Sequence, residues 1–320
     1  MGSRSRSRPR LLSIDQIEAA RGRIAGTVVR TPLVRLQQDG PAEIYLKLEN
    51  LQPIGSFKLR GAGNALALAE ADALWTASAG NMAQAVAWHA RERGLPCTAV
   101  VPDTAPQTKL DAIERLGASV VKVPPETWFE VFRTRSYPGM EGLFVHAFSD
   151  QAVMAGNGTI GLEILEDLPD PDAVLIPFGG GGLSCGIASA LRALAPACKV
   201  YACEVETAAP LAASLAADEP VEIEHTPSFV DGIGAPTVFP EMFELARELL
   251  DGSLVVGLDD VAAAIRLLVE RNRVVAEGAG AAPVAAALGD SAGTGKIVCV
   301  LSGGNLDTAT LQTILSGRRP

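Results

Sequence analysis

Residues 53–61 read Pro-Ile-Gly-Ser-Phe-Lys-Leu-Arg-Gly and join a predicted strand to a predicted helix. Alternating apolar residues over 44–48 indicate the strand, and Ala- and Leu-rich residues 59–70 indicate the helix. Pro53 and Gly55 fit the loop, and Ser56 fits an N-cap, which places Lys58 in the first helical turn. The field of a helix N-terminus, together with burial, lowers the pKa of an amine. Lys58 is therefore a candidate nucleophile, although a lone lysine is by default a solvated surface residue.

Four consecutive glycines, 179–182, follow an apolar run at 173–178 and precede a predicted helix that begins near Leu183. Residues without side chains let several backbone N–H groups approach one anion, and the helix N-terminus adds positive potential. This pattern predicts a phosphate site rather than a flexible turn. A dinucleotide site would place its glycines in the first strand–helix unit, and no Gly-Lys-Ser/Thr follows the loop.

Two more polar segments stand at strand ends. Ser302 follows the apolar run 297–301, and Ser78-Ala79-Gly80-Asn81 lies between a strand at 74–77 and a helix at 82–93. Parallel α/β proteins place ligand groups at the carboxyl ends of their strands. Strands and helices alternate along most of the chain, which predicts a parallel sheet with right-handed crossovers.

Taken together, these motifs resemble the serine/threonine dehydratase and serine racemase branch of the pyridoxal-phosphate enzymes with the tryptophan synthase β fold, from about Ile14 to Asp307. The resemblance implies an α/β, fold type II protein of two three-layer domains with mainly parallel twisted sheets. It implies a large cofactor domain at 13–55 and 149–320 and a small domain at 56–148. We expect residues 1–12, which include four arginines within the first ten positions, to be a disordered basic leader.

The resemblance also assigns site residues. Lys58 would bond covalently to the cofactor and act as the catalytic base, Asn81 would donate to the ring oxygen, Ser302 would hydrogen-bond the ring nitrogen, and Glu277 would support the ring. The implied cofactor-binding set is Phe57, Lys58, Asn81, Gly179, Gly180, Gly181, Gly182, Leu183, Glu277 and Ser302. The implied substrate-binding set is Ser78, Ala79, Gly80, Asn81 and Met82.

Three positions depart from the family pattern. Ala79 stands where serine racemase has a second serine, which argues against efficient racemisation. Met82 stands where many members have histidine, so we expect a more apolar pocket. Glu204 and the carbonyl of Ala208 match a cation site, but Pro210 replaces an aspartate there. The resemblance thus implies a divalent or monovalent cation at a site that lacks one carboxylate, and the alternative is that Glu204 caps a helix or forms an ion pair.

These features predict an ammonia-lyase that converts a β-hydroxy amino acid, such as threonine or serine, into a 2-keto acid and ammonia. A serine hydroxyl at the ring nitrogen favours β-elimination over transamination. Alternatives are a dehydratase for a bulkier substrate (phenylserine, hydroxyaspartate or a hydroxyectoine-derived acid), a racemase and a β-replacing synthase. A cofactor carrier without activity and a nucleotide-binding regulator also stay open.

Composition indicates which partners and which cellular compartment to expect. The net charge of −10 argues against a nucleic-acid partner, and no apolar run reaches membrane-spanning length. Five cysteines without a CxxC pair suggest neither a disulfide framework nor a zinc site, so we expect a cytoplasmic enzyme, and from the family a homodimer. The aromatic-rich segment 124–142 lacks periodicity, and we expect local packing there rather than a substrate-pocket wall.

Overall fold

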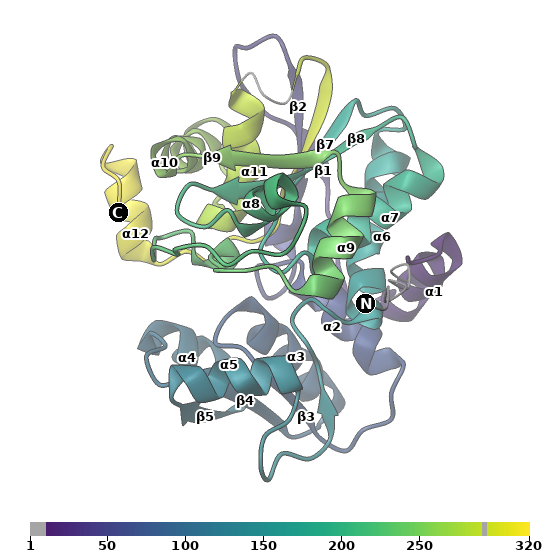
Figure 1. Ribbon diagram of the computed structural model, residues 1–320, viewed down its shortest axis with the longest axis vertical. Coiled ribbons are helices and arrows are strands. Elements are labelled where there is room, and N and C mark those ends of the chain that lie inside the picture. Colours follow the sequence, from purple (N-terminus) through teal and green to yellow (C-terminus); the bar gives the residue numbers. More distant parts are fainter. Residues whose placement is uncertain (1–10, 290–292) are drawn as a thin grey trace, which may run out of the picture.

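A computed structural model describes residues 11–289 and 293–320 and contains two sheets in two stacked parts (Figure 1). The larger part lies above the smaller one in this view. Residues 1–10 of the expected leader lie outside the described residues. Leu12, which we placed at the end of that leader, is only 8% exposed and packs in the core of the larger part.

The larger sheet has six strands in the order β1-β2-β10-β7-β8-β9. Only the β1–β2 pair is antiparallel; the other pairs are parallel. The strands are β1 (Leu33–Arg35), β2 (Glu43–Leu48), β7 (Ala173–Pro177), β8 (Lys199–Val205), β9 (Gly252–Val256) and β10 (Lys296–Leu301). The predicted α/β class with mainly parallel sheets is confirmed.

Helices cover both faces of this sheet, because its strands are apolar on both sides. Val298 and Val300 of β10 join one core with α1, α6, α7 and α9, whereas Cys299 and Leu301 join the opposite core with α10 and α11. The helices are α1 (Ile14–Ile24), α6 (Gln151–Asp167), α7 (Gly182–Leu194), α8 (Pro210–Ala217), α9 (Pro240–Leu249), α10 (Leu258–Leu267), α11 (Gly278–Leu288) and α12 (Thr308–Leu315), with short 3-10 helices η1 (Glu49–Leu51) and η2 (Asp231–Ile233) and a π-helix η3 (Leu268–Asn272).

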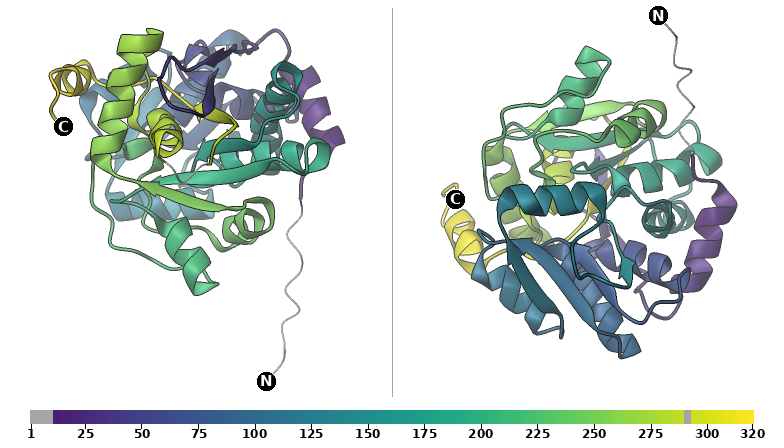
Figure 2. Two further views of the ribbon diagram at one scale, coloured as in Figure 1. Left: turned by 90° about the horizontal axis from the view of Figure 1, so that it is seen from above. Right: turned by 60° about the horizontal axis from the view of Figure 1, so that its bottom comes forward.

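The smaller sheet is fully parallel, in the order β5-β4-β3-β6. Its strands are β3 (Leu74–Ala77), β4 (Cys97–Pro102), β5 (Ser119–Val123) and β6 (Leu143–Phe144). Helices α2 (Lys58–Ala67), α3 (Asn81–Arg93) and α4 (Gln107–Glu114) pack on one face. Helix α5 (Pro125–Thr134) lies across the other, as the right-hand view of Figure 2 shows. All four strands fall within residues 56–148.

The structure differs from the sequence-based expectations in several elements. The segment 124–142, which shows no periodic pattern and where we expected local packing, contains helix α5. The sequence did not predict β9, α8 or α12. Strand β9 is an edge strand beside β8; it begins with Gly-Ser and Val255 is 46% exposed, so it lacks the long apolar run that marked the central strands.

Candidate active site

Helix α2 begins at Lys58, at the junction of the two parts. Its N-cap is Phe57, which has helical dihedral angles and makes no side-chain cap. The expectation that Ser56 caps this helix is therefore wrong. Ser56 instead pairs with Gly303 in an isolated bridge, and the Phe57 N–H donates to the Ser302 carbonyl over 2.9 Å. The lysine loop is thus hydrogen-bonded to the end of β10, about 245 residues further along the chain.

The Lys58 amine lies in a partly enclosed polar environment. Its Nζ donates to the Ala147 carbonyl at 2.7 Å and lies 4.9 Å from the centre of the Phe57 ring. Burial lowers the pKa of Lys58 to about 8, and the negative charge of Glu277 opposes part of that shift. The charged form still predominates near neutral pH, but the uncharged amine that a nucleophile or proton acceptor requires is far more populated than in an ordinary lysine.

The glycine loop joins β7 to α7 and has no room for side chains. Gly181 has φ +85°, which favours glycine. A Cβ on Gly180 would lie 2.0 Å from the Phe148 ring, and one on Gly182 would lie 2.6 Å from the Phe148 carbonyl oxygen. Asn157 Nδ2 supports the loop by donating to the Gly182 carbonyl at 3.2 Å. Leu183 is 5% exposed and anchors the first turn of α7 in the core.

We expect Gly182→Ala to weaken cofactor binding, because the new methyl group would meet backbone atoms of Phe148 that cannot rotate away. Overpacking of about 1–3 kcal/mol corresponds to a roughly ten- to hundred-fold weaker Kd. Titration of the apoprotein with the cofactor measures this. Gly22→Ala is the matched control, since nothing lies within 4 Å of a Cβ there. Equal Kd values for the two variants would contradict the close packing.

The Asn81 loop meets Glu277 from the larger part. Asn81 begins α3, and its Nδ2 lies 3.0 and 3.2 Å from the two carboxylate oxygens of Glu277. Asn305 Nδ2 donates to Asn81 Oδ1 at 2.8 Å and also to the Ile54 carbonyl. Asn305 is a site residue that our assignment missed, although it follows directly on Ser302-Gly303-Gly304.

The predicted substrate residues are not equally placed. Ser78, Ala79 and Gly80 are half-buried, and the Gly80 N–H donates to Ser78 Oγ at 3.2 Å. Met82 is 1% exposed and packs in the core of the smaller part, and its place in the substrate pocket stays a prediction.

Glu277 lies at the N-cap of α11, and its N–H donates to the Gly303 carbonyl at 3.0 Å. Burial raises the pKa of Glu277 to about 7, the Asn81 amide opposes that rise, and Asp231 adds to it. Ser302 is 2% exposed at the carboxyl end of β10. The structure therefore brings Lys58, Ser302, Asn81 and Glu277 into one connected set.

The Glu204 carboxylate accepts hydrogen bonds from other groups of the protein. Its carboxylate accepts from the N–H groups of Leu211 and Ala212 at 2.8 Å each, and from Ser253 Oγ at 2.6 Å. Ala208 pairs with Val205 in an isolated bridge. These contacts make Glu204 a cap of α8, which was the alternative to a cation ligand. Within the described residues, no cluster of three or more His, Cys, Asp or Glu side chains is arranged to hold a metal ion.

The aromatic segment reaches the site through Phe148. Phe132 of α5 lies 5.4 Å from Phe148 and 6.0 Å from Phe239, measured between ring centres, and His146 lies within the same cluster. Burial and the charges of Arg135 and Lys58 lower the pKa of His146 to about 3, so its ring is neutral. Its Nδ1 accepts from the Ser149 N–H at 3.0 Å. This cluster therefore packs behind Phe148 and the glycine loop, beyond the local packing that we expected.

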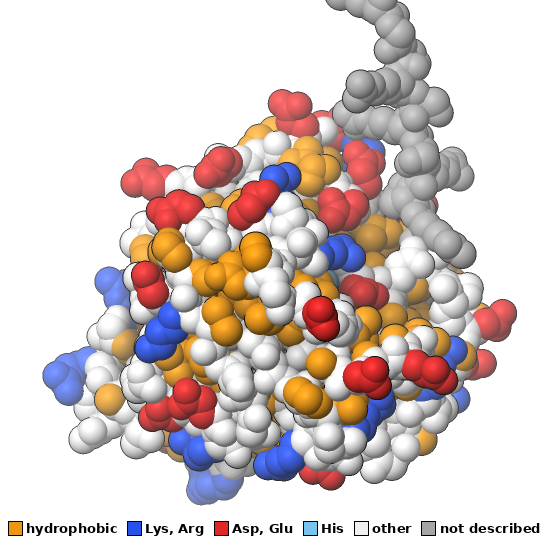
Figure 3. All heavy atoms as spheres, turned by 90° about the horizontal axis from the view of Figure 1, so that it is seen from below, with side chains coloured by type: hydrophobic (Ala, Val, Ile, Leu, Met, Phe, Trp, Pro, Cys, Tyr) orange, Lys and Arg blue, Asp and Glu red, His pale blue; other side chains and the backbone are white. Residues whose placement is uncertain are grey.

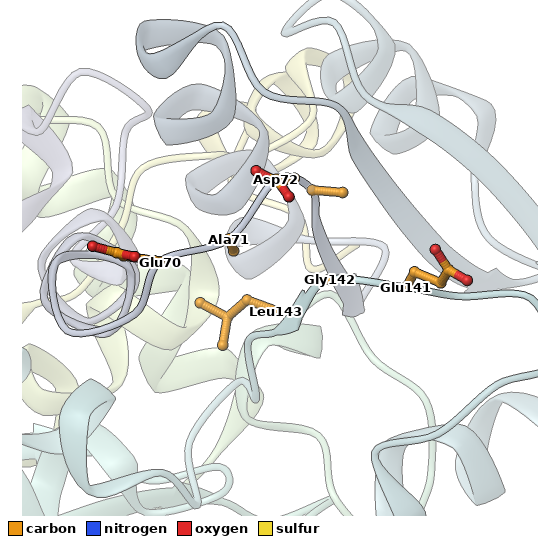
Figure 4. A pocket seen from close by; sticks show the side chains of 7 residues that line it. Glu70, Ala71, Asp72, Glu141, Gly142 and Leu143 are labelled. Atoms are coloured by element: carbon orange, nitrogen blue, oxygen red, sulfur yellow. The ribbon is translucent and has the colours of Figure 1, made fainter.

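Two cavities among the described residues border the smaller part, and one of them contains the predicted site residue Glu277. A cavity of about 430 Å³ lies between the parts and includes Glu277 and Asn305. Another, of about 450 Å³, is bordered by Glu70, Asp72 and Glu141, which lie well apart around it (Figure 4). The 450 Å³ cavity contains none of the predicted site residues, whereas the 430 Å³ cavity contains Glu277 but not Lys58, the glycine loop or Ser302.

The residues present fit pyridoxal phosphate on three structural grounds. The Lys58 amine has a lowered pKa, the glycine loop presents a helix N-terminus that tolerates no side chain, and Ser302 ends the adjoining strand. In addition, Ser56 Oγ is buried without a hydrogen-bond partner in the described structure. An unpartnered hydroxyl beside Gly303 leaves a polar group available to a ligand.

Comparisons with known proteins agree with this geometry. Residues 24–303 match the family model described as pyridoxal-phosphate dependent enzyme. The chain is 39% identical to an L-threonine ammonia-lyase of Thermotoga maritima, with 96% of this chain and 79% of that protein covered. It is 36% identical to the catabolic L-threonine dehydratase of Escherichia coli, with 95% and 96% covered.

Solved structures show the same likeness. Maize serine racemase superimposes with a TM-score of 0.86 at 30% identity, over 96% of this chain and 98% of that one. The processed form of threonine deaminase isoform 2 from Solanum lycopersicum gives 0.83 at 30% identity, over 96% and 95%. The fold expected from the sequence is therefore confirmed.

Proposed function

Because the chain belongs to the family of pyridoxal-phosphate dependent enzymes, we propose that it is an ammonia-lyase for a small β-hydroxy amino acid. L-Threonine is the first candidate and L-serine the second, and the products are a 2-keto acid and ammonia. The observation that carries this proposal is the Lys58 amine of lowered pKa, held beside Ser302 at the end of β10. Relatives named as threonine ammonia-lyase or dehydratase, at 36–39% identity, support the choice of reaction.

We assign proton transfer, substrate binding and phosphate binding to different residues of the chain. Pyridoxal phosphate, when bound, withdraws electrons and makes the substrate's Cα proton acidic. Lys58 Nζ accepts that proton, which its lowered pKa permits. Backbone N–H groups at the start of α3, from Ser78 to Asn81, bind the substrate carboxylate. The glycine loop at the start of α7 holds the cofactor phosphate, and Asn157 fixes that loop.

Ala79 favours elimination over racemisation. A racemase needs a second group that moves a proton on the face opposite the lysine, and a methyl side chain can neither accept nor donate one. Ala79 is half-buried in the loop before α3, and the only side-chain hydroxyl of that loop, on Ser78, accepts from the Gly80 N–H. The likeness to serine racemase nevertheless makes racemisation the second candidate function.

A substrate panel tests the proposal. The holoenzyme is incubated with L-threonine, L-serine, D-serine, phenylserine and hydroxyaspartate, and the keto acid and the enantiomer composition are measured. Keto acid from L-threonine or L-serine is the expected result. Turnover of only a bulkier member would move the proposal to the alternative dehydratase, and conversion between enantiomers without keto acid would overturn it in favour of a racemase.

Four further features belong to the proposal. We propose that residues 56–148 form the small domain and residues 13–55 and 149–320 the large one, in line with the division of the strands.

We also propose that the protein works in the cytoplasm. Its five cysteines are buried and free, as in a reducing compartment. Within the described residues, no helix combines the length and apolar character needed to span a membrane. The face in Figure 3 mixes acidic, basic and apolar side chains and shows no continuous basic area, which supports the absence of a nucleic-acid partner.

The fourth feature is a homodimer. Val29, Leu51 and Val275 are 43%, 50% and 38% exposed. They lie near one another, because Val29 hydrogen-bonds Gln52 and the Val275 carbonyl accepts from Asn50. This apolar area is the surface that we propose for the dimer. Light scattering of the holoenzyme tests it, and a monomer mass would contradict it.

A further inference from the structure

An ion pair crosses the cleft beside the proposed active site. Lys109 on α4 of the smaller part pairs with Asp231 on η2 of the larger part. In Figure 1, α4 lies at the upper edge of the smaller part, below the loops of the larger one. Both residues line the 430 Å³ cavity that also contains Glu277 and Asn305. The pair therefore lines the same cavity as Glu277 and Asn305, the two hydrogen-bond partners of Asn81.

The Lys109–Asp231 pair is linked to Asn81 by packing contacts through η2 and Glu277. The 3-10 helix η2 packs on α11, whose N-cap is Glu277, and a Cβ on Gly232 would lie 3.7 Å from Glu277 Oε1. Glu277 in turn accepts from Asn81 on α3, a neighbour of α4 in the smaller part. Two contacts thus span the cleft in parallel, α4 to η2 and α3 to α11, and a shift of η2 relative to α4 would displace Glu277 from Asn81.

We propose that Lys109 and Asp231 are a positioning pair, which holds α4 against η2 and thereby keeps Glu277 hydrogen-bonded to Asn81. This inference rests on the proposed function, because Asn81 is assigned to substrate and cofactor there. Neither Lys109 nor Asp231 touches the reacting atoms; they act through Glu277. The Lys109 and Asp231 side chains are 33% and 64% exposed, so solvent screens their attraction and moderate effects are expected.

The charges around Glu277 predict a change in the pH dependence of activity that a purely structural role of the pair would not produce. Asp231 raises the pKa of Glu277, whereas Lys109 and Lys58 lower it. Arg115 and Asp307 are further charged residues along the cavity. The carboxylate form of Glu277 is the better acceptor for Asn81, so activity should fall as Glu277 is protonated. In the pH profile of kcat/KM, this fall is the acid limb. Removing Lys109 should move the acid limb to higher pH, and removing Asp231 should move it to lower pH.

The experiment compares Lys109→Met, Asp231→Asn, the double variant and Lys109→Arg as holoenzymes. We expect Lys109→Met and Asp231→Asn each to raise KM a few-fold with a smaller change in kcat. The acid limbs of kcat/KM should shift by a few tenths of a pH unit in opposite directions and largely cancel in the double variant. Lys109→Arg should resemble the wild type, since it keeps the charge.

A matched control exists in Lys296→Met. Lys296 pairs with Asp170, and the two side chains are 35% and 72% exposed, nearly as in the proposed pair, but they lie away from this cavity. Lys296→Met should leave KM and the acid limb unchanged. If Lys109→Met behaves like Lys296→Met, or if both single variants move the limb in the same direction, the inference is wrong.

Hydrogen exchange separates this inference from the proposed function, because it needs no turnover. In the holoenzyme without substrate, Lys109→Met should speed exchange several-fold in residues 107–114 and 231–234, and Lys109→Arg should not. Faster exchange in an enzyme that yields no keto acid would overturn the proposed function alone. Unchanged exchange in an enzyme that turns over threonine would overturn the positioning pair alone.

Discussion

Changing Lys58 to alanine is expected to lower keto acid formation by about 10²- to 10⁴-fold or more, the loss that follows removal of a positioned proton-transfer group. Alanine leaves no amine to bond the cofactor or to accept the Cα proton. Among the described residues, the Lys58 amine makes one hydrogen bond, to the Ala147 carbonyl, so it contributes little else to the structure. Activity should therefore be lost without a comparable loss of stability.

Two measurements distinguish this result from simple unfolding. Borohydride reduction followed by peptide mass analysis should find the cofactor attached at Lys58 in the wild type and nowhere in Lys58→Ala. Lys122→Ala, at an exposed position of β5, is the control and should keep both activity and attachment. Attachment at another lysine, or substantial activity in Lys58→Ala, would remove the basis of the assignment.

Replacing Arg60 by alanine is expected to lower the free energy of unfolding by about 3–5 kcal/mol, as for other buried ion pairs that lose one partner. Arg60 is 0% exposed, two residues after Lys58 on α2. Its guanidinium donates to both carboxylate oxygens of Glu49 at 2.8 Å and to those of Glu163 at 2.6 and 2.8 Å. Lys47 Nζ also donates to Glu163, at 2.6 Å.

The four charges of this buried network balance, two positive against two negative, and they join β2, η1, α2 and α6. Without Arg60, Glu49 would keep a carboxylate that is shut away from water and lacks its guanidinium partner. Urea denaturation of the holoenzyme measures the loss. Arg30→Ala is the control, because Arg30 pairs with Glu166 and Asp167 at the surface and should cost about 0–1 kcal/mol. Equal losses for the two variants would contradict this account.

The same network predicts a pH dependence of stability. Burial tends to raise the pKa of Glu49, but the Arg60 charge and hydrogen bonds outweigh it and hold that pKa below its ordinary value. A carboxyl whose pKa is lower in the folded state contributes stability above its unfolded pKa of about 4.3 and loses it as the pH falls through the folded value. The acid destabilisation of the wild type below about pH 4.3 should therefore shrink in Glu49→Gln.

Local sequence signals were sufficient for the elements that carry the chemistry. Buried strands such as β7 and β10 are apolar along their whole length, and the glycine run can be read without any tertiary information. The lysine at the start of α2 followed from one loop and one helix pattern. Edge strand β9 and the short helix α8 escaped prediction, because exposure and brevity remove the periodic apolar pattern on which such predictions depend.

The roles of individual polar residues depended on partners that are distant in sequence. Ser56 looks like an N-cap locally, but its partner is Gly303, and Phe57 takes the cap position. Glu204 matches a cation ligand by position, whereas the N–H groups of α8 occupy its oxygens. In each case a local pattern allowed two roles, and packing selected one of them.

The sequence by itself determined the α/β class, the lysine at a helix start and the glycine loop, because each depends on residues close together in the chain. Only the tertiary structure decided that Phe57 is hydrogen-bonded to Ser302, that Glu277 meets Asn81 and Asn305, and that Lys109 faces Asp231. Such contacts depend on how the two sheets are placed relative to each other. That placement follows in part from the packing of α2 of the smaller part against α6 of the larger part, which no short stretch of sequence encodes.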